Sequence, residues 1–114
     1  MSDLKKLREL TADFLKVLSD PIRLDILYLL EKNTLNAFKI QKKANRSQST
    51  ISKHLNMLVE NNLIDFEKRD NIKYYRIKNS EIFEIINDIN TIILNNTKVK
   101  LKEIQEADRY DALS

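Results

Sequence analysis

The side chains best suited to chemistry in this sequence are cations, amides and hydroxyls gathered in the middle of the chain. Between Lys32 and Val59 the sequence has six Lys or Arg residues and no Asp or Glu. Amides and hydroxyls can hydrogen-bond to base edges in a DNA major groove, and cations pair with phosphates. Within this stretch, the candidates for such contacts on one short helix are Gln48, Ser49, Thr50, Ser52, Lys53 and Asn56.

The charge is distributed unevenly along the chain. The formal net charge is only +3, but residues 32–59 carry +6, whereas residues 79–114 carry −3. A run of like charge is often no more than a solvated face. Here the missing acids favour a polyanionic partner, and double-stranded DNA is the partner we expect.

The composition excludes several classes of protein. The chain has no Cys, no Gly and one His. Without Cys it can form neither disulfides nor thiolate metal sites, and without Gly it lacks the Gly-rich loops of nucleotide-binding enzymes. A single His makes nucleophile–base pairs hard to assemble, so we expect neither an enzyme nor a cofactor.

Length and hydropathy predict one modest domain. The chain has 114 residues, enough for a single core. No apolar run approaches the roughly 18 residues of a membrane helix, and the first residues lack the apolar segment of a signal peptide. We therefore expect a cytoplasmic protein with no membrane partner.

Apolar residues recur at helical spacing through the first half of the chain. The predicted helices cover about residues 3–18, 21–32, 37–44 and 48–61. Asp20 and Pro21 mark the start of the second helix, as a cap and a first helical residue. In the third helix we expect three inward residues, namely Phe38, Ile40 (or Gln41) and Ala44.

The last two of these helices predict a helix-turn-helix over about residues 36–61. Ser47 is a good N-cap for the second helix of the pair. Its apolar stripe of Ile51, Leu55 and Leu58 leaves the polar residues on the opposite face. Two short helices joined by a tight turn are typical of a DNA-binding unit. The cations beside the turn, which we expect on phosphate, are Lys42, Lys43 and Arg46.

A basic β-hairpin is predicted directly afterwards, over about residues 63–78. Its two strands and its turn cover residues 63–68, 73–78 and 69–72. Alternation places Ile64 and Phe66 on one face of the hairpin. Their partners across the ladder are Tyr75 and Ile77. A basic hairpin after a helix-turn-helix is the wing of a winged helix, and the cations expected to grip phosphate are Lys68, Arg69, Lys73 and Arg76.

From Ser80 onward a helical pattern continues to about residue 106, with Asn95-Asn96-Thr97 as its weak point. A continuous helix of this length would span about 40 Å, longer than the roughly 34 Å diameter of a compact domain of this size. Its apolar stripe therefore needs a partner, most simply a second copy. The expected dimer interface of helices 3–18 and 80–106 consists of Leu4, Leu7, Ile82, Ile85, Ile86, Ile89, Ile92 and Ile93.

Three segments resemble those of a known family in the same order. Residues 12–27 (ADFLKVLSDPIRLDIL), 47–55 (SQSTISKHL) and 74–77 (YYRI) are similar to the opening signature, recognition helix and wing end of the ArsR/SmtB winged-helix repressors. The resemblance implies a mainly α fold with a two-stranded β wing, in the order α-α-α-α-β-β-α, as a single domain over residues 1–114. It also implies a homodimeric repressor that binds an inverted repeat and releases it when an inducer binds.

The chain departs from this family at the positions that bind metal. Members that sense metal through the third helix place thiolates where this chain has Asn36 and Phe38. Members that bind zinc on the last helix use positions matched here by Asn79, Glu81, Ile92 and Asn95. One carboxylate without an imidazole cannot form a tetrahedral zinc site. We therefore expect no metal site, and the inducer, whether a small molecule or a protein, stays unknown.

Two other functions stay open. The protein could be an architectural protein that coats DNA with little sequence preference. Alternatively, the winged helix could be a protein-interaction module with negligible affinity for DNA. The sequence also does not separate repression from activation.

Two polar residues outside the basic face need an explanation. His54 lies beside Leu55 on the inward side of its helix, so we expect it to pack structurally rather than to bind a ligand. For Arg23 on the second helix we expect an internal ion pair with a nearby acid rather than a DNA contact.

Overall fold

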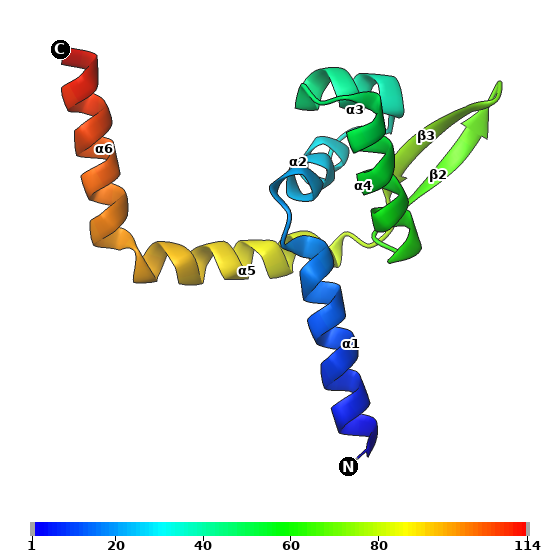
Figure 1. Ribbon diagram of the computed structural model, residues 1–114, viewed down its shortest axis with the longest axis horizontal. Coiled ribbons are helices and arrows are strands. Elements are labelled where there is room, and N and C mark those ends of the chain that lie inside the picture. The colour runs from blue at the N-terminus through cyan, green and yellow to red at the C-terminus, as the bar shows by residue number, and fades with distance from the viewer. Residues whose placement is uncertain (1, 114) are drawn as a thin grey trace. The chain divides into compact units, whose positions relative to one another are not determined.

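The computed structural model describes residues 2–113, except for the side chains of residues 2, 98–101 and 110–113. Within that range the chain forms six helices and three strands (Figure 1). In chain order they are α1 (Ser2–Leu18), α2 (Pro21–Leu30), β1 (Leu35–Asn36), α3 (Ala37–Ala44), α4 (Gln48–Glu60), β2 (Ile64–Arg69), β3 (Ile72–Ile77), α5 (Glu81–Asn96) and α6 (Lys98–Leu113). The predicted winged-helix fold is confirmed.

The chain divides into two compact units, Met1–Ser80 and Glu81–Ser114. The first unit contains α1 to α4 and the sheet, and the second contains α5 and α6. The helical pattern breaks at the Asn-Asn-Thr segment, where helix propensity is low. Thr97 ends α5 by donating from its N–H and its Oγ1 to the carbonyl oxygen of Ile93, at 2.9 and 2.6 Å. Of the apolar residues beyond the break, the side chains of Val99 and Leu101 lie outside the described part.

The sheet has the order β1-β3-β2, with both pairs antiparallel. The predicted register of the wing is confirmed, because Ile64 pairs with Ile77 and Phe66 with Tyr75. The turn between the two strands is shorter than predicted. It consists of Asp70 and Asn71, whose φ values are 52° and 65°. Two left-handed residues are what a tight hairpin turn requires. The two-residue strand β1, which pairs with β3 near the wing base, was not predicted.

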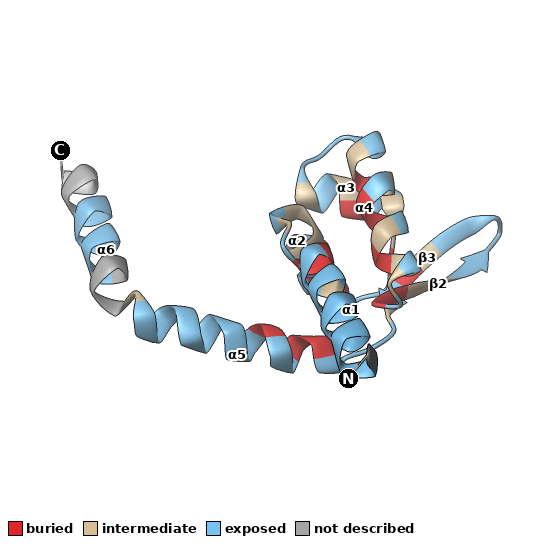
Figure 2. Ribbon diagram, turned by 60° about the horizontal axis from the view of Figure 1, so that its bottom comes forward, coloured by how far each residue is buried: buried red, intermediate tan, exposed pale blue. Residues whose placement is uncertain are grey.

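The core of the first unit lies between α2, α3, α4 and the base of the wing, whereas the wing tip is exposed (Figure 2). The predicted stripe of α4 is confirmed, since Ile51, Leu55 and Leu58 are all buried. Burying an Ile or Leu side chain of this kind contributes about 1.5–3 kcal/mol. The other side chains that are most completely buried here are Ile26, Leu27, Ile40 and Ile64.

The prediction that Phe38 points inward was wrong. Its side chain is 61% exposed, whereas Ile40 is fully buried. Residues two apart on a helix lie about 200° apart around its axis, so α3 cannot bury both. Ile40 occupies the core, and the Phe38 ring lies outside with the Lys42 ammonium 4.7 Å from its centre.

Within residues 2–113, none of the helices is both long and apolar enough to cross a membrane.

Candidate nucleic-acid interface

The turn between α3 and α4 is built without glycine. Asn45 adopts a left-handed conformation at φ 55°, and its N–H donates to the carbonyl oxygen of Lys42 at 3.3 Å. The N–H of Arg46 donates to the carbonyl oxygen of Gln41 at 3.2 Å. These bonds satisfy carbonyls that the end of α3 would otherwise leave unpaired. The turn thereby sets where α4 begins.

The first turn of α4 is held by hydroxyl groups. The Ser47 Oγ accepts a hydrogen bond from the N–H of Thr50 at 3.3 Å and lies 2.9 Å from the Thr50 Oγ1. It also lies 3.3 Å from the Ser49 Oγ. Because Ser47 caps the helix, the remaining N–H groups and the helix dipole give this end a positive character that suits phosphate.

The six candidate DNA-contacting residues on α4 differ in how far their side chains are exposed. Thr50 and Ser52 are half-buried, and the Thr50 hydroxyl is engaged by the cap. The other four side chains are exposed on the outer face of α4, namely Gln48, Ser49, Lys53 and Asn56. The exposed face of α4 therefore carries the amide of Gln48 at its start, the amide of Asn56 farther along, and the Lys53 ammonium between them.

The cations beside the turn are all exposed: Lys42, Lys43 and Arg46. No Asp or Glu lies between Lys32 and Val59, so no acid of this segment competes for them. The three charges therefore flank the start of α4, where the amide of Gln48 is exposed.

The wing places two ammonium groups on one rung of its ladder. Lys68 of β2 lies directly opposite Lys73 of β3. Ring faces also lie beneath cations here, because Lys73 is 4.5 Å from the Phe66 ring centre and Arg69 is 4.3 Å from that of Tyr74. Such contacts restrain long side chains and leave their charge exposed.

Arg76 is engaged differently from the other wing cations. Its guanidinium donates to Asp65 Oδ1 at 2.7 Å and to Glu67 Oε2 at 3.3 Å. The hydrogen bond to Asp65 and the charge of that carboxylate raise the pKa of Arg76 above its usual value. The guanidinium therefore already has two anionic partners within the sheet.

A groove lies between the start of α3 and the wing, which sequence reasoning did not find. Its exposed apolar walls are Phe38 at 61% and Ile72 at 46% exposure. The residues lining it are Asn36, Ala37, Phe38, Lys68, Asn71, Ile72, Lys73 and Tyr75. The groove is therefore apolar at its sides and cationic at the wing.

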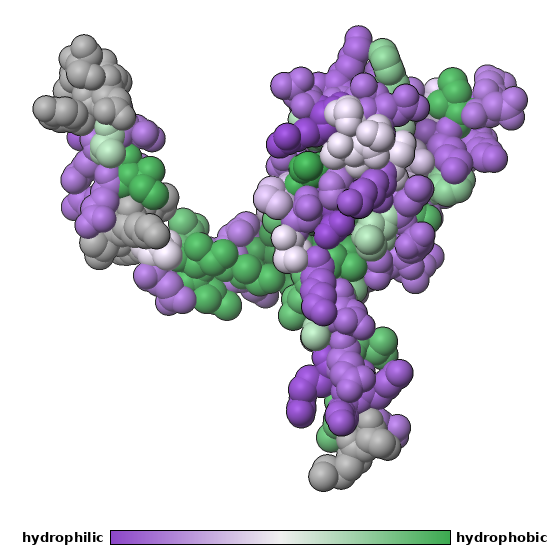
Figure 3. Space-filling model, viewed as in Figure 1, coloured by the Kyte–Doolittle hydropathy of each residue, from purple (hydrophilic) through white to green (hydrophobic). Residues whose placement is uncertain are grey.

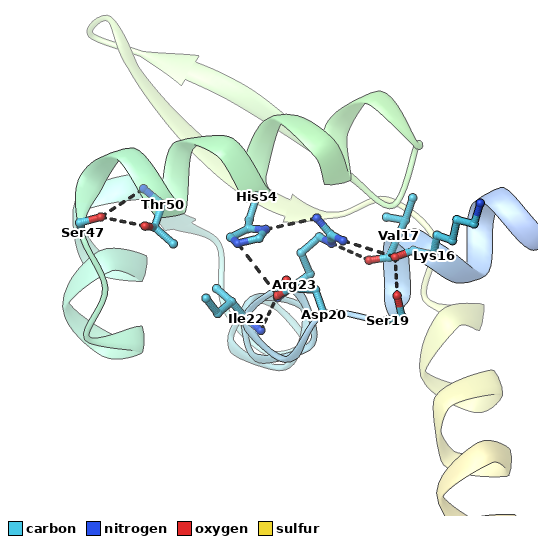
Figure 4. Close-up of polar contacts among 9 residues, drawn as sticks. All are labelled: Lys16, Val17, Ser19, Asp20, Ile22, Arg23, Ser47, Thr50 and His54. Carbon is cyan, nitrogen blue, oxygen red and sulfur yellow. Dashed lines mark hydrogen bonds and ion pairs between the residues drawn. The ribbon is translucent and has the colours of Figure 1, made fainter.

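A polar network links the end of α1 with α2 and α4 (Figure 4). Arg23 donates to the carbonyl oxygens of Val17 and Lys16 and lies 3.3 Å from His54 Nδ1. Asp20 caps α2 by accepting from the N–H groups of Ile22 and Arg23 at 2.8 and 3.2 Å. Arg23 thus contacts two carbonyl oxygens and an imidazole, rather than the acid expected from the sequence.

Asp20 is held in its charged form. Partial burial opposes its ionisation, but the hydrogen bonds from the two backbone N–H groups and the charge of the nearby Arg23 outweigh burial. Together they lower the pKa of Asp20 below its usual value of 3.8. The charge also suits the positive end of α2.

The positions that the resemblance matches to metal ligands hold no such set here. Asn36 uses its side-chain oxygen to cap α3, where it accepts from the N–H of Lys39 at 2.8 Å. Within the described part of the chain, no three His, Asp or Glu side chains cluster closely enough to hold a metal ion.

The apolar residues expected at a dimer interface fall into two groups. Ile82 and Ile86 are already buried in the single chain. Green apolar side chains line α5 in Figure 3, within the second unit. The expected interface residues that are exposed are Leu4 and Leu7 on α1 and Ile85, Ile89, Ile92 and Ile93 on α5.

Known proteins match this chain in sequence and in fold. A family described as "Bacterial regulatory protein, arsR family" matches residues 20–65. The arsenical resistance operon repressor of Staphylococcus aureus is 34% identical over 94 residues, which cover 82% of this chain and 90% of that protein.

Two solved structures illustrate the likeness in fold. NolR from Sinorhizobium fredii superposes with a TM-score of 0.75 at 27% identity, over 81% of this chain and 92% of that one. A homodimeric winged helix-turn-helix DNA-binding domain from Mycobacterium bovis gives a TM-score of 0.72 at 22% identity, over 84% and 92%. Together with the sequence match to the staphylococcal repressor, these likenesses show that the chain belongs to the arsR family of bacterial regulatory proteins, which are DNA-binding transcriptional regulators and not enzymes.

Proposed function

We propose that this protein is a homodimeric repressor that binds an inverted repeat in duplex DNA with sequence specificity. The observation that carries the proposal is the exposed polar face of α4, which begins at a capped helix end and is flanked by three cations. Amides and hydroxyls at the start of a helix can enter the major groove, while neighbouring cations fix the register on phosphate. We refer to α4 as the recognition helix.

Within the recognition helix the roles divide by chemistry. Gln48 is the best candidate for a base edge, because an exposed amide can donate and accept at once, as adenine requires. Ser49, Thr50, Ser52 and Asn56 are further base candidates. Lys53 and the cations Lys42, Lys43 and Arg46 contact phosphate, where a point charge is sufficient.

The cations of the wing add further contacts to the phosphate backbone of the DNA. Lys68, Arg69 and Lys73 are exposed, with Arg69 4.3 Å from the Tyr74 ring centre and Lys73 4.5 Å from that of Phe66. They are therefore available to phosphate. Arg76 is the weakest wing contact in this proposal, because it would have to leave Asp65 and Glu67 to reach DNA.

Self-association rests on the exposed apolar residues of α1 and α5. Two exposed Leu side chains on α1 and four exposed Ile side chains on α5 are costly in water and are covered most simply by a second copy. The Mycobacterium bovis domain of the same fold is homodimeric, which supports the proposal. A two-fold symmetric dimer would read a two-fold symmetric site, hence an inverted repeat. Ile82 and Ile86 would support the interface from behind rather than meet the partner.

The proposal places the protein in the cytoplasm, where the DNA lies, and includes no metal effector, because the matched positions lack the donors. The S. aureus relative is named a repressor. Its likeness supports repression rather than activation for this chain.

Selection of binding sites from random duplexes tests the proposal directly. We expect enrichment of an inverted repeat whose half-sites are about one helical turn apart, or a multiple of it. Binding without enrichment would instead support an architectural protein that coats DNA. Negligible binding even at low salt would support a protein-interaction module.

A further inference from the structure

Arg23 joins three segments of the first unit (Figure 4). Its Nε donates to the carbonyl oxygen of Val17 at 2.6 Å and its Nη2 to that of Lys16 at 3.3 Å. These carbonyls lie at the C-terminal end of α1, where a helix leaves its oxygens without helical partners. The third nitrogen, Nη1, lies 3.3 Å from His54 Nδ1 on the recognition helix. One planar group therefore connects the end of α1 to α4.

The partners fix the protonation of His54. A guanidinium has donors only, so Nδ1 of the imidazole must accept the hydrogen bond. The ring proton then lies on Nε2, on the side where Asp20 Oδ1 is 4.0 Å away. The imidazole is only 6% exposed, so water cannot easily replace Arg23 as its partner. The arrangement requires a neutral His54.

Few charged groups face this imidazole. Arg23 and Asp20 are charged side chains that lie 3.3 and 4.0 Å from it. Of the elements packed against α4, α2 carries Asp25 on its exposed side, as α3 does its cations Lys39, Lys42 and Lys43. The acids of β2, Asp65 and Glu67, are paired with Arg76. The state of the Arg23–His54 contact therefore depends mainly on His54 and its two neighbours.

We propose that Arg23 is a positioning residue for DNA recognition, which holds His54 and so fixes the recognition helix against the end of α1. The inference rests on the proposed function, since it assumes that α4 reads DNA. Neither Arg23 nor His54 touches DNA in this scheme. Their contribution is to keep the exposed face of α4 at the angle that the major groove requires, because small displacements of a binding group are costly.

Nuclear magnetic resonance can test the first step without DNA. His54 is the only histidine of the chain, so its imidazole nitrogens give one unambiguous set of signals. At pH 8 we expect the Nε2–H tautomer, with the Nδ1 shift of an acceptor, and a change in that shift in Arg23→Met. An Nδ1–H tautomer in the wild-type protein, or no response to Arg23→Met, would overturn the proposal.

DNA binding tests the second step with two variants at one position. The side-chain oxygen of Asn can occupy the place of Nδ1, whereas that of Gln reaches the place of Nε2. We expect His54→Asn to keep most of the affinity for a duplex selected by the wild-type protein. His54→Gln should lose about tenfold, as expected for a hydrogen bond to a charged group. For Arg23→Met, which removes a cation, the control is Lys102→Met on α6, where the cation lost is an exposed one.

A double-mutant cycle completes the test. Arg23→Met and His54→Gln should each weaken specific binding about tenfold, and together only about 20-fold, because both remove one contact. A product near 100-fold would show that the two residues act independently and would overturn the proposal. If the wild-type protein selects no duplex, the proposed function fails. If it selects one and the variants equal it, only this inference fails.

Discussion

Lys68 and Lys73 lie directly opposite each other on the wing, so that two ammonium groups share one rung of the β2–β3 ladder. Like charges in that arrangement destabilise a hairpin, and the cost is relieved when an anion lies between them. The Lys73 ammonium lies over the Phe66 ring, 4.5 Å from its centre. The wing is therefore more strained electrostatically without a bound anion than with one.

Removing one of these charges should weaken DNA binding without weakening the fold. For Lys73→Gln we expect lower affinity for every duplex and a salt slope, the dependence of log affinity on log salt, smaller by about 1. Thermal stability at low salt should stay the same or rise, since the repulsion is removed. An unchanged salt slope in fluorescence anisotropy titrations would exclude Lys73 as a phosphate contact.

Arg76 offers a matched comparison on the same strand. For Arg76→Gln we expect a smaller change in the salt slope than for Lys73→Gln, because Asp65 and Glu67 already neutralise the guanidinium. The same titrations measure both variants. A larger effect for Arg76 would show that this side chain leaves its carboxylates on binding.

Two exposed positions of the recognition helix should separate specificity from affinity. Gln48→Ala should mainly relax sequence choice at one position of each half-site, at a cost of about 1–3 kcal/mol for the preferred base. Lys53→Gln should weaken binding to all sequences about equally. Competition titrations with selected and scrambled duplexes compare the two, and uniform weakening by Gln48→Ala would contradict its assignment to a base.

The proposed dimer can be broken from α5. Ile92 is 59% exposed, so Ile92→Asp should leave the monomer folded and place a charge in the interface. We expect a shift to monomer in analytical ultracentrifugation and a loss of affinity for the inverted repeat. Ile104→Asp on α6 is the control, since Ile104 is 50% exposed and lies outside the proposed interface. Equal effects of the two changes would argue against this choice of interface.

Asp20 should link stability to pH in the acid range. The pKa of Asp20 is lowered in the folded state, so its charged form contributes stability above its unfolded value near 3.8. That contribution is lost as the pH falls through the lower folded value. Asp20→Ala should therefore cost about 1 kcal/mol at pH 6, and the difference from wild type should shrink by pH 3. Urea denaturation at the two pH values measures this, with Asp13→Ala on exposed α1 as a control expected to change little.

The local patterns of this chain explain how much of the fold was predictable. Alternation along the wing set its register, because a slip of one residue would turn Tyr75 out of the core. The spacing of Ile51, Leu55 and Leu58 identified the buried side of α4. Ser47 and Asp20 were recognisable caps, since their side chains bond to backbone within three residues. These features depend on neighbours in sequence.

What the sequence could not predict depends on distant neighbours. Phe38 and Ile40 compete for one core position of α3, and only the packed structure decides between them. The partners of Arg23 come from α1 and from His54, 31 residues away, and no local signal specifies that contact. Likewise, the pairing of Arg76 with Asp65 follows from strand register and lowers its availability to DNA. The helical pattern could predict that most of these polar residues are exposed, but not which partner each side chain contacts.

The turns of this chain are formed without glycine, because the sequence has none. The described residues with positive φ are Asn45, Asn62, Asp70 and Asn71. Side chains of this kind tolerate the left-handed conformation but restrict the alternatives open to the backbone far more than glycine does. Asn45 sits in the turn of the helix-turn-helix, so α4 has no glycine hinge there about which to swing. Any adjustment of α4 to DNA must then move α3 and α4 together as one rigid block. A glycine at residue 45 would introduce a flexible hinge that the natural chain lacks.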